Sequence, residues 1–221
     1  MNDKSKRIFG NEISKADYRK ALRTKQKYTK KYGDDSSSDY SVKLLPNSTL
    51  HDSLGVYDIR VNEGKSNEPF DLEKGIIVGN IRMGFGHYRI SIAMASAAQA
   101  LGYTPYWMDL NSFSETTCTK VIGAQNDLYS LGSRISQKSR AFNKAVWEPM
   151  NYEGFRQLSY NSSDQKNAEL MAAVFRNIPK DLPIIGTHVW PAQAAIHAGM
   201  KYVVNAIPDN WPMALHLAEG S

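Results

Sequence analysis

The fold is decided by a short apolar run bounded by glycines, Gly75-Ile76-Ile77-Val78-Gly79-Asn80. Such a run is typical of a strand that is buried on both faces of a parallel sheet. A loop with two glycines follows it, and residues 87–101 carry apolar side chains at helical spacing. Residues 103–110 predict a second strand. A strand, a helix and a strand within about 35 residues predict a βαβ unit with a right-handed crossover.

The alternation of helices and strands continues outward from this unit. The helix over 87–101 is expected to end at Gly102 and to pack through one apolar face, made of Ile90, Ala93, Met94, Ala97 and Leu101. Pro149 and a polar turn at 160–163 are expected to separate the helices of the middle region. The later predicted elements are helices near 118–132, 134–148 and 164–177, a strand over 182–187, a helix over 191–198 and a strand over 201–207. The sequence therefore predicts an α/β fold, with a Rossmann-like parallel sheet flanked by helices.

Basic side chains gather at the start of the chain. The 221 residues have a net charge of +5, and residues 1–50 hold 12 Lys+Arg against 6 Asp+Glu. Residues 1–42 therefore predict a basic, polar helical extension with a linker. Residues 43–74 predict an irregular lead-in with one strand at 55–61, and residues 75–221 predict the Rossmann-like domain. The extension favours either a solvated helix or contact with an anionic membrane surface through residues 1–31.

Composition excludes several classes of protein. The content of apolar residues, 42%, and of charged residues, 22%, fits a globular protein and excludes fibrous and wholly disordered chains. No apolar run approaches the roughly 18 residues of a membrane span, and the N-terminus lacks a signal peptide's apolar region. The single cysteine, Cys118, excludes an internal disulfide framework. We therefore expect a cytoplasmic protein, with peripheral attachment at the inner membrane face as the option that the basic extension offers. No aromatic-interleaved RNA motif is present, and no nucleic acid is expected as a partner.

Three loops follow the carboxyl ends of predicted strands, where open parallel sheets bind ligands. In the first loop, Gly84 and Gly86 allow a ligand to approach the backbone, and the helix start favours an anionic group. His87 lies in the first helical turn, where the positive end of the helix favours a neutral imidazole that can accept a proton. His87 is thus the predicted catalytic residue. The predicted acceptor- or phosphate-binding residues are Asn80, Gly84, Phe85, Gly86, Arg89, His188, Trp190, Asp209, Asn210 and Trp211.

These residues also have structural interpretations, which the sequence leaves open. The glycines can serve a tight turn, His188 can be a hydrogen-bonded strand-end residue, and the tryptophans can belong to the core. A dinucleotide site with Asp109 as the ribose ligand ranks last, because Arg89 stands where the G-x-G-x-x-G fingerprint needs its third glycine. The five histidines show no paired ligand spacing, so no metal site is predicted.

The loop Gly84-Phe85-Gly86-His87-Tyr88-Arg89-Ile90-Ser91, between a strand and an alanine-rich helix, resembles the G-G-G-H-x-x-A/S loop of diacylglycerol glycosyltransferases. These are monogalactosyldiacylglycerol-synthase-like enzymes, related to the N-acetylglucosaminyltransferases that form lipid II. The resemblance covers about residues 75–217. Further segments resemble the family in the same order: Met108-Asp109-Leu110, Trp147-Glu148-Pro149-Met150, Thr187-His188-Val189-Trp190-Pro191 and Ala206-Ile207-Pro208-Asp209-Asn210-Trp211. Met83 and Phe85 depart from the glycine triplet, which weakens the inference of a phosphate cradle.

The resemblance implies the N-terminal, acceptor-binding half of a GT-B fold. It implies that His87 is a candidate base for an acceptor hydroxyl and that the acceptor is a lipid or small molecule. It also implies that a nucleotide-sugar donor binds in a C-terminal domain that this chain lacks, so that the chain alone is expected to be inactive. The alternative is a non-enzymatic Rossmann-like binding module that docks on a membrane or a partner through its basic arm.

Overall fold

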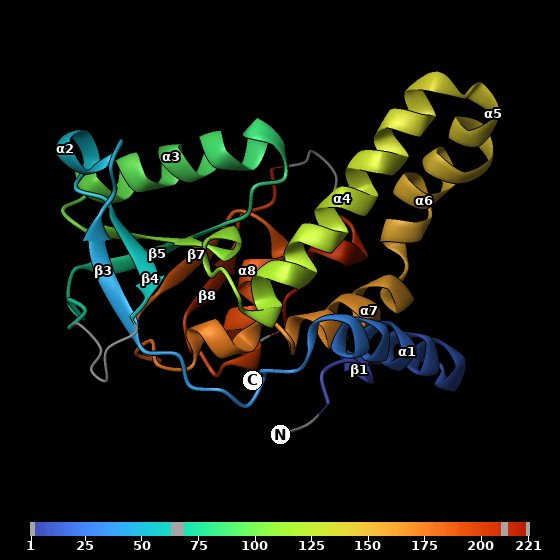
Figure 1. Ribbon diagram of the computed structural model, residues 1–221, viewed down its shortest axis with the longest axis horizontal. Coiled ribbons are helices and arrows are strands. Elements are labelled where there is room, and N and C mark those ends of the chain that lie inside the picture. The colour runs from blue at the N-terminus through green and yellow to red at the C-terminus, as the bar shows by residue number, and fades with distance from the viewer. Residues whose placement is uncertain (1–2, 63–68, 209–211, 220–221) are drawn as a thin grey trace.

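A six-stranded sheet forms the centre of the computed structural model, which describes residues 3–62, 69–208 and 212–219 (Figure 1). The strand order is β3-β4-β6-β5-β7-β8, with β3 antiparallel to β4 and every other neighbouring pair parallel. The strands are β3 (Val42–Pro46), β4 (Tyr57–Val61), β5 (Gly75–Asn80), β6 (Thr104–Asp109), β7 (Ile184–Gly186) and β8 (Val203–Asn205). The predicted α/β fold with a Rossmann-like, mostly parallel sheet is therefore confirmed.

The segment predicted as an irregular lead-in belongs to this sheet. The expected strand at 55–61 is present as β4, which pairs in parallel with β6. The strand β3 was not predicted, and it pairs with β4 along its full length, from Val42 opposite Val61 to Pro46 opposite Tyr57. The five residues of β3 show no clear alternation of apolar and polar side chains, so they form a strand because they pair with β4 rather than because of their own sequence. The sheet therefore begins before residue 75.

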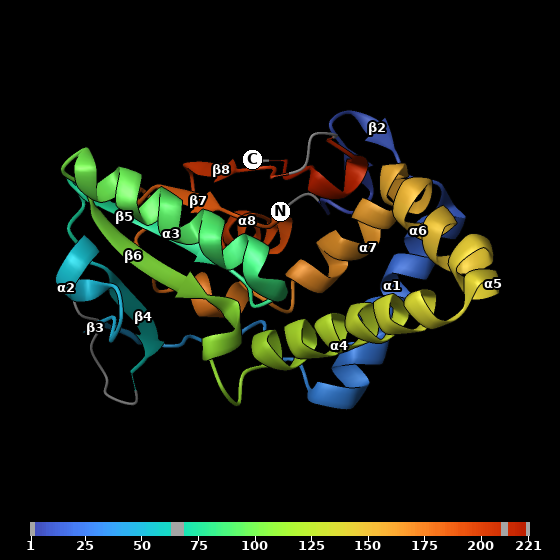
Figure 2. The same ribbon diagram turned by 90° about the horizontal axis from the view of Figure 1, so that it is seen from above.

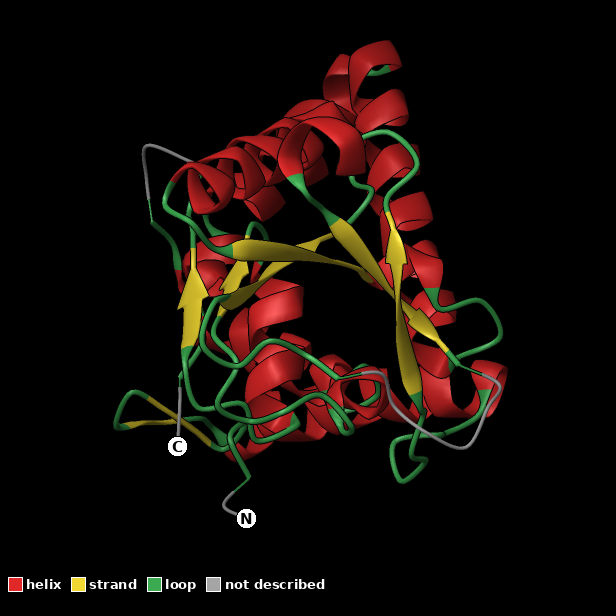
Figure 3. Ribbon diagram, turned by 90° about the vertical axis from the view of Figure 1, so that its left-hand side faces the viewer, coloured by secondary structure: helices red, strands yellow, loops and turns green. Residues whose placement is uncertain are grey.

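The helices flank the sheet on both sides, and Figure 3 shows the sheet between them. They are α1 (Lys15–Tyr32), α2 (His51–Leu54), α3 (Gly84–Ala100), α4 (Thr117–Lys138), α5 (Arg140–Phe142), α6 (Glu148–Tyr152), α7 (Leu158–Ala168) and α8 (Val189–His197), with a π-helical turn at Asn143–Trp147 and a small hairpin of β1 (Arg7–Ile8) and β2 (Asn11–Glu12). Two predicted breaks are wrong. Pro149 lies in the first turn of α6, where proline is tolerated, and residues 160–163 lie inside α7. The helix predicted over 164–177 is divided, since α7 ends at Ala168.

Alternate residues of the central strands serve two hydrophobic clusters. Ile77 and Met108 face the larger cluster, which α4, α8 and the segment 170–178 complete. Val78 and Trp107 face the smaller cluster beneath α3. Figure 1 shows α3 on one face of the sheet and α8 on the other. This two-sided burial explains why β5 has no polar side chain before its last residue, Asn80.

The face of α3 that packs on the sheet differs from the predicted one. Ser91, Ala95 and Ala98 are the buried positions, and Leu101 is 76% exposed. The small side chains let the helix lie close to the strands, so the packing distance selects the face rather than the spacing of the larger apolar residues. Gly102 ends the helix as predicted, with a φ of 82°.

The predicted basic extension is packed into the fold rather than solvated along its length. Figures 1 and 2 show α1 lying along α7. Ala21 of α1 is fully buried, and Tyr28 packs against the larger cluster. Lys25 of α1 pairs with Glu169 at 2.8 Å. Paired charges and aromatic rings give this basic helix a packing face that its composition does not reveal. Within the described ranges, no helix combines the length and apolar character that crossing a bilayer requires.

Candidate functional site

Two histidines lie close together at the carboxyl ends of β5 and β7, the neighbouring strands between which the strand order of the sheet reverses. From β5 the chain passes through α3 to β6, whereas from β7 it passes through α8 to β8 on the opposite side. The loops at the carboxyl ends of these two neighbouring strands therefore diverge, which is the place where open α/β sheets bind ligands. His87 follows β5 and His188 follows β7, and their ring centroids lie 5.0 Å apart. The structure thus brings these two predicted residues together.

The imidazole of His87 is held in one orientation by the backbone of β7's end. Its Nδ1 lies 2.7 Å from the carbonyl oxygen of Thr187. Since a carbonyl can only accept, Nδ1 carries the proton in the neutral ring, and Nε2 is left as the basic nitrogen. The Ser91 hydroxyl lies 2.9 Å from the His87 carbonyl and 2.8 Å from the Thr187 hydroxyl, which in turn donates to Gly79 O. This network ties the start of α3 to β5 and β7.

His188 is neutral and serves as the N-cap of α8. Its Nδ1 accepts the backbone N–H of Trp190 at 3.2 Å. Burial lowers the pKa of His188 well below its usual range, and the neighbouring His87 and His216 lower this pKa further. The ring of His188 also packs edge-on against Trp190, with centroids 4.6 Å apart. His188 therefore supports its neighbours without adding a positive charge beside His87.

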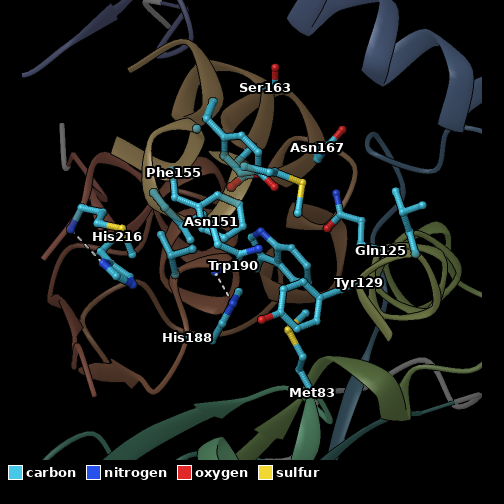
Figure 4. Close-up of a pocket in the computed structure, with 18 of the residues that line it drawn as sticks. Met83, Gln125, Tyr129, Asn151, Phe155, Ser163, Asn167, His188, Trp190 and His216 are labelled. Carbon is cyan, nitrogen blue, oxygen red and sulfur yellow. Dashed lines mark hydrogen bonds between the residues drawn. The ribbon is translucent and has the colours of Figure 1, made fainter. Parts of the chain in front are cut away.

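A cavity of about 950 Å³ opens beside these histidines. It lies between the sheet edge, which contributes Met83, His87, His188 and Trp190, and a wall of helices from α1, α4, α6 and α7 (Figure 4). Its aromatic lining consists of Tyr28, Tyr129, Phe142, Trp147, Phe155, Tyr160 and Trp190. The cavity therefore offers large apolar faces, together with a basic nitrogen at one edge.

Polar groups without partners stand on the helical side of this cavity. Asp164 and Asn167 of α7 and Gln125 of α4 each present a buried side-chain oxygen that has no hydrogen-bond partner among the described residues. The indole Nε1 of Trp190 is in the same condition. Burial raises the pKa of the Asp164 carboxyl to about 7, and a long-range hydrogen-bond interaction with the Trp190 indole N–H offsets part of that rise. These groups can bind a ligand that enters the cavity.

The sequence did not predict the part of the cavity lining that α7 provides, here called the α7 wall, which includes Tyr160, Ser163, Asp164 and Asn167. Residues 161–168 are polar except for Ala168, yet all but Ser163 are buried. A polar run at helical spacing normally predicts a solvated helix, and here the neighbouring α1, α8 and the short segments 154–156 and 214–216 exclude water from it. The one available signal was the absence of any apolar face on a helix of three turns within a globular chain.

The other predicted residues lie apart from the cavity lining. Asn80 is fully buried and accepts the Ser91 hydroxyl at 3.1 Å, so it supports the loop from below. Phe85 is 81% exposed, and Gly84, Gly86 and Arg89 are also exposed. None of these five lines the cavity. The predicted residues Asp209, Asn210 and Trp211 lie outside the described residues.

Asp109, the residue considered for a ribose, is engaged in the turn that follows β6. Its carboxylate accepts from Arg82 Nε at 2.6 Å, from Asn111 N at 2.9 Å and from Ser112 Oγ at 3.1 Å. It does not line the cavity. Over the part of the chain that the structure describes, no three His, Cys, Asp or Glu side chains gather as metal ligands.

Comparison with known proteins gives one finding. A family model described as a domain of unknown function, DUF6937, matches residues 7–221. No curated protein and no solved structure matches the sequence. The matched range includes α1 and the strand pair β3–β4, so the family's unit extends over the segments that the sequence had set apart from the sheet.

Proposed function

Because the chain belongs to the DUF6937 family, whose description assigns no activity, we propose a function from the cavity itself. The chain binds a hydroxyl-bearing, amphipathic acceptor as the acceptor side of a glycosyl transfer, and His87 is the general base. The observation that carries this proposal is the orientation of His87 at the switch point of the sheet. Its Nδ1 is committed to Thr187 O, so Nε2 is available to take a proton.

The cavity supports an acceptor of this kind. Ligand cavities of roughly 300–1,000 Å³ hold small organic molecules, and this one is about 950 Å³. Tyr129, Trp147 and Tyr160 supply apolar faces for a hydrocarbon chain or a sugar ring. The partner of the chain is therefore proposed to be a lipid or another small molecule with a hydroxyl group.

The reaction follows from the position of the base. The acceptor hydroxyl gives its proton to His87 Nε2 while its oxygen forms a bond to the anomeric carbon of the donor sugar. The bond from that carbon to the nucleotide diphosphate breaks, and the leaving oxygen keeps the electron pair. The carbonyl of Thr187 then stabilises the imidazolium through Nδ1–H. The nucleotide sugar itself is expected to be bound by a second Rossmann-like unit.

The test uses the protein purified from its own cells through a tag on this chain, so that a donor-binding unit is recovered with it. Transfer of labelled sugar from UDP-glucose, UDP-galactose or UDP-N-acetylglucosamine to 1,2-dioctanoylglycerol or to octyl glucoside is measured. His87→Ala should lower turnover by roughly 10²–10⁴-fold, as expected for a lost general base. The matched control is His51→Ala, because His51 lies on α2, away from the cavity. Failure of the wild-type complex to consume any donor would remove the transferase proposal, and an unchanged rate in His87→Ala would remove the base.

A second function is favoured by one surface, the exposed basic stripe of α1. Arg19, Arg23, Lys27 and Lys30 follow one another at helical spacing and are all exposed. On the adjoining face of the same helix, Lys20, Thr24 and Tyr28 line the cavity. We propose that the stripe docks on an anionic membrane surface, which would bring the cavity to its lipid ligands.

The docking proposal is tested by sedimentation with vesicles. Since α1 is packed into the fold, charge substitution is the suitable change rather than deletion of residues 1–40. Replacing the four stripe residues by glutamine should abolish binding to phosphatidylcholine vesicles that contain 30% phosphatidylglycerol, and 0.5 M salt should have the same effect. Replacing four basic residues elsewhere, Lys43, Lys74, Arg134 and Lys144, should not. Equal binding by both variants would contradict the proposal.

A further inference from the structure

We propose that Asp164, Asn167 and Trp190 form a subsite that binds neighbouring hydroxyl groups of a polyol or sugar head group. This inference deepens the proposed acceptor-binding function and rests on it. The three side chains are nearly excluded from solvent, with exposures of 4% for Asp164, 3% for Asn167 and 7% for Trp190. All three line the cavity.

The hydrogen-bonding capacity left open in this subsite is mixed. Asn167 Oδ1 needs a donor and Trp190 Nε1–H needs an acceptor, whereas the Asp164 carboxyl accepts when it is ionised and donates when it is protonated. Among the described residues none of these atoms makes a hydrogen bond of standard geometry, and the Trp190 indole N–H interacts with the Asp164 carboxyl only at longer range. Gln125 of α4 adds a further oxygen of the same kind. Figure 4 shows Gln125, Asn167 and Trp190 around the same cavity. Leaving several buried polar groups unpaired is unfavourable, so a ligand that pairs them gains affinity.

A hydroxyl group matches this mixture because it donates one hydrogen bond and accepts others. An ammonium group only donates, so it would leave the Trp190 indole N–H unpaired. A phosphate or carboxylate only accepts, so it would leave the amide oxygens of Asn167 and Gln125 unpaired, and it would stand beside the Asp164 carboxyl. With one donor on the protein and several acceptors, two or more adjacent hydroxyl groups satisfy the subsite best. Tyr129 and Tyr160 also line the cavity and offer faces on which a sugar ring stacks.

The subsite is connected to His87 through a series of contacts along one wall. His87 packs against His188, with ring centroids 5.0 Å apart, and His188 packs against Trp190 at 4.6 Å. The Trp190 indole in turn lies close enough to Asp164 to influence its pKa. A head group held by Asp164 and Asn167 therefore extends along Trp190 and His188 toward the base. On this arrangement the subsite selects the acceptor, and His87 activates a further hydroxyl of the same head group.

Four probes with the same eight-carbon chain separate the ligand classes: octyl glucoside, octanol, octylamine and octanoate, all below their micelle concentrations. Binding to the purified chain is measured by calorimetry. The wild type should bind octyl glucoside at least tenfold more tightly than each of the others. In Asn167→Leu and in Asp164→Leu, octyl glucoside should bind about tenfold more weakly while octanol binds as before. The control Asp181→Leu alters an exposed aspartate that precedes β7 and does not line the cavity, and it should leave all four affinities unchanged.

Three results would overturn the subsite: equal affinities for octyl glucoside and octanol, tightest binding of octylamine or octanoate, or a sugar preference that survives in both leucine variants. Thermal unfolding establishes that each variant is folded, and the two variants alter different residues, so one folded variant is sufficient for the test. Absence of binding by every probe would also count against it. His87→Ala should keep the sugar preference, so loss of transferase activity and loss of the subsite remain distinguishable.

Discussion

The loops after β5 and β6 and the cavity wall formed by α7 differ in how far the oxygens and rings of their polar side chains are paired. After β5 and β6, the His87 imidazole, the Asn80 amide oxygen and the Asp109 carboxylate each have a hydrogen-bond partner within the protein, although the Asn80 amide nitrogen has none among the described residues. On the α7 wall, Asp164 Oδ2 and Asn167 Oδ1 have none among the described residues. Satisfied groups fix the orientation of a reactive atom, whereas unsatisfied ones retain the capacity to bind a ligand at a cost in stability. The sheet edge is thus suited to chemistry and the α7 wall to recognition.

The largest expected effect concerns the buried carboxyl on the α7 wall. The pKa of Asp164 is about 7 when folded and 3.8 in its ordinary state, so between these values the folded protein keeps a proton that the unfolded chain loses. The contribution of this group to stability therefore falls as pH rises from about 4 through 7. Asp164→Asn should be more stable than the wild type at pH 8, by up to about 4 kcal/mol, and nearly equal to it at pH 4. Urea unfolding at both pH values measures the difference.

The control for this pH dependence is His197, whose contribution to stability changes with pH in the opposite direction. Burial lowers the pKa of His197 from 6.5 to about 4, so the unfolded chain binds the proton first and stability is lost as pH falls through that range. His197→Gln should therefore reduce the loss of unfolding free energy at low pH. It should leave unchanged the loss of unfolding free energy at pH 8, which comes from Asp164. If Asp164→Asn gained nothing at pH 8, the α7 wall would not carry an unfavourable buried charge.

The charge cluster that joins the N-terminus to α7 gives the next effect. Lys166 is buried and pairs with Asp3 at 2.9 Å and with Glu169 at 2.6 Å. Lys166→Met leaves two carboxylates without their buried partner, and we expect a loss of about 3 kcal/mol in unfolding free energy. The matched control Lys201→Met breaks an exposed pair with Asp181, for which a loss below about 1 kcal/mol is expected. Equal losses would show that the packing of this region does not depend on the pair.

Close packing at the sheet edge is tested by adding one methyl group. A Cβ at Gly79 would lie 2.8 Å from Pro191 Cβ and 3.4 Å from Ile184 Cδ1. Gly79→Ala should therefore destabilise the protein by about 1–3 kcal/mol, as overpacking does. In the control Gly123→Ala, the added Cβ meets no atom within 4 Å inside α4, and a gain of about 0.4–1 kcal/mol is expected. A neutral Gly79→Ala would mean that the start of α8 moves freely against β5.

The smallest effects compare single polar groups on the two sides. Ser91→Ala removes a hydroxyl that contacts Asn80, His87 and Thr187, and we expect a loss of about 1 kcal/mol. Asn167→Leu removes an amide whose buried oxygen has no partner among the described residues, so its effect should be neutral or stabilising. Thermal unfolding of the two variants ranks them. A reversed ranking would contradict the contrast between the two sides.

The spacing of apolar residues in the sequence predicted the central strands and the helix between them, β5, α3 and β6. The strand over 75–80 is β5 at the same bounds, and the strand over 103–110 and the helix over 87–101 differ from β6 and α3 by at most three residues at each end. The strand β3 and the buried face of α3 were missed, since strand pairing and the distance between helix and sheet involve residues far apart in the chain. The site divides in the same way. His87 and His188 follow predicted strands, so parallel-sheet topology indicated both. Asp164 and Asn167 lie in a polar run, and the only signal there was that the run has no apolar face.

The sequence by itself determined the parallel sheet, the loops at its carboxyl ends and the histidines on them, because a strand buried on both faces must be apolar and a parallel sheet places its loops together. The tertiary structure alone decided that the polar helix α7 is buried, that α1 packs beside it and that Asp164 faces a cavity. Burial is a property of what surrounds a residue, and the neighbours of Asp164 in space include Trp190, which lies 26 positions further along the chain. The chemistry of the α7 wall was therefore set by packing.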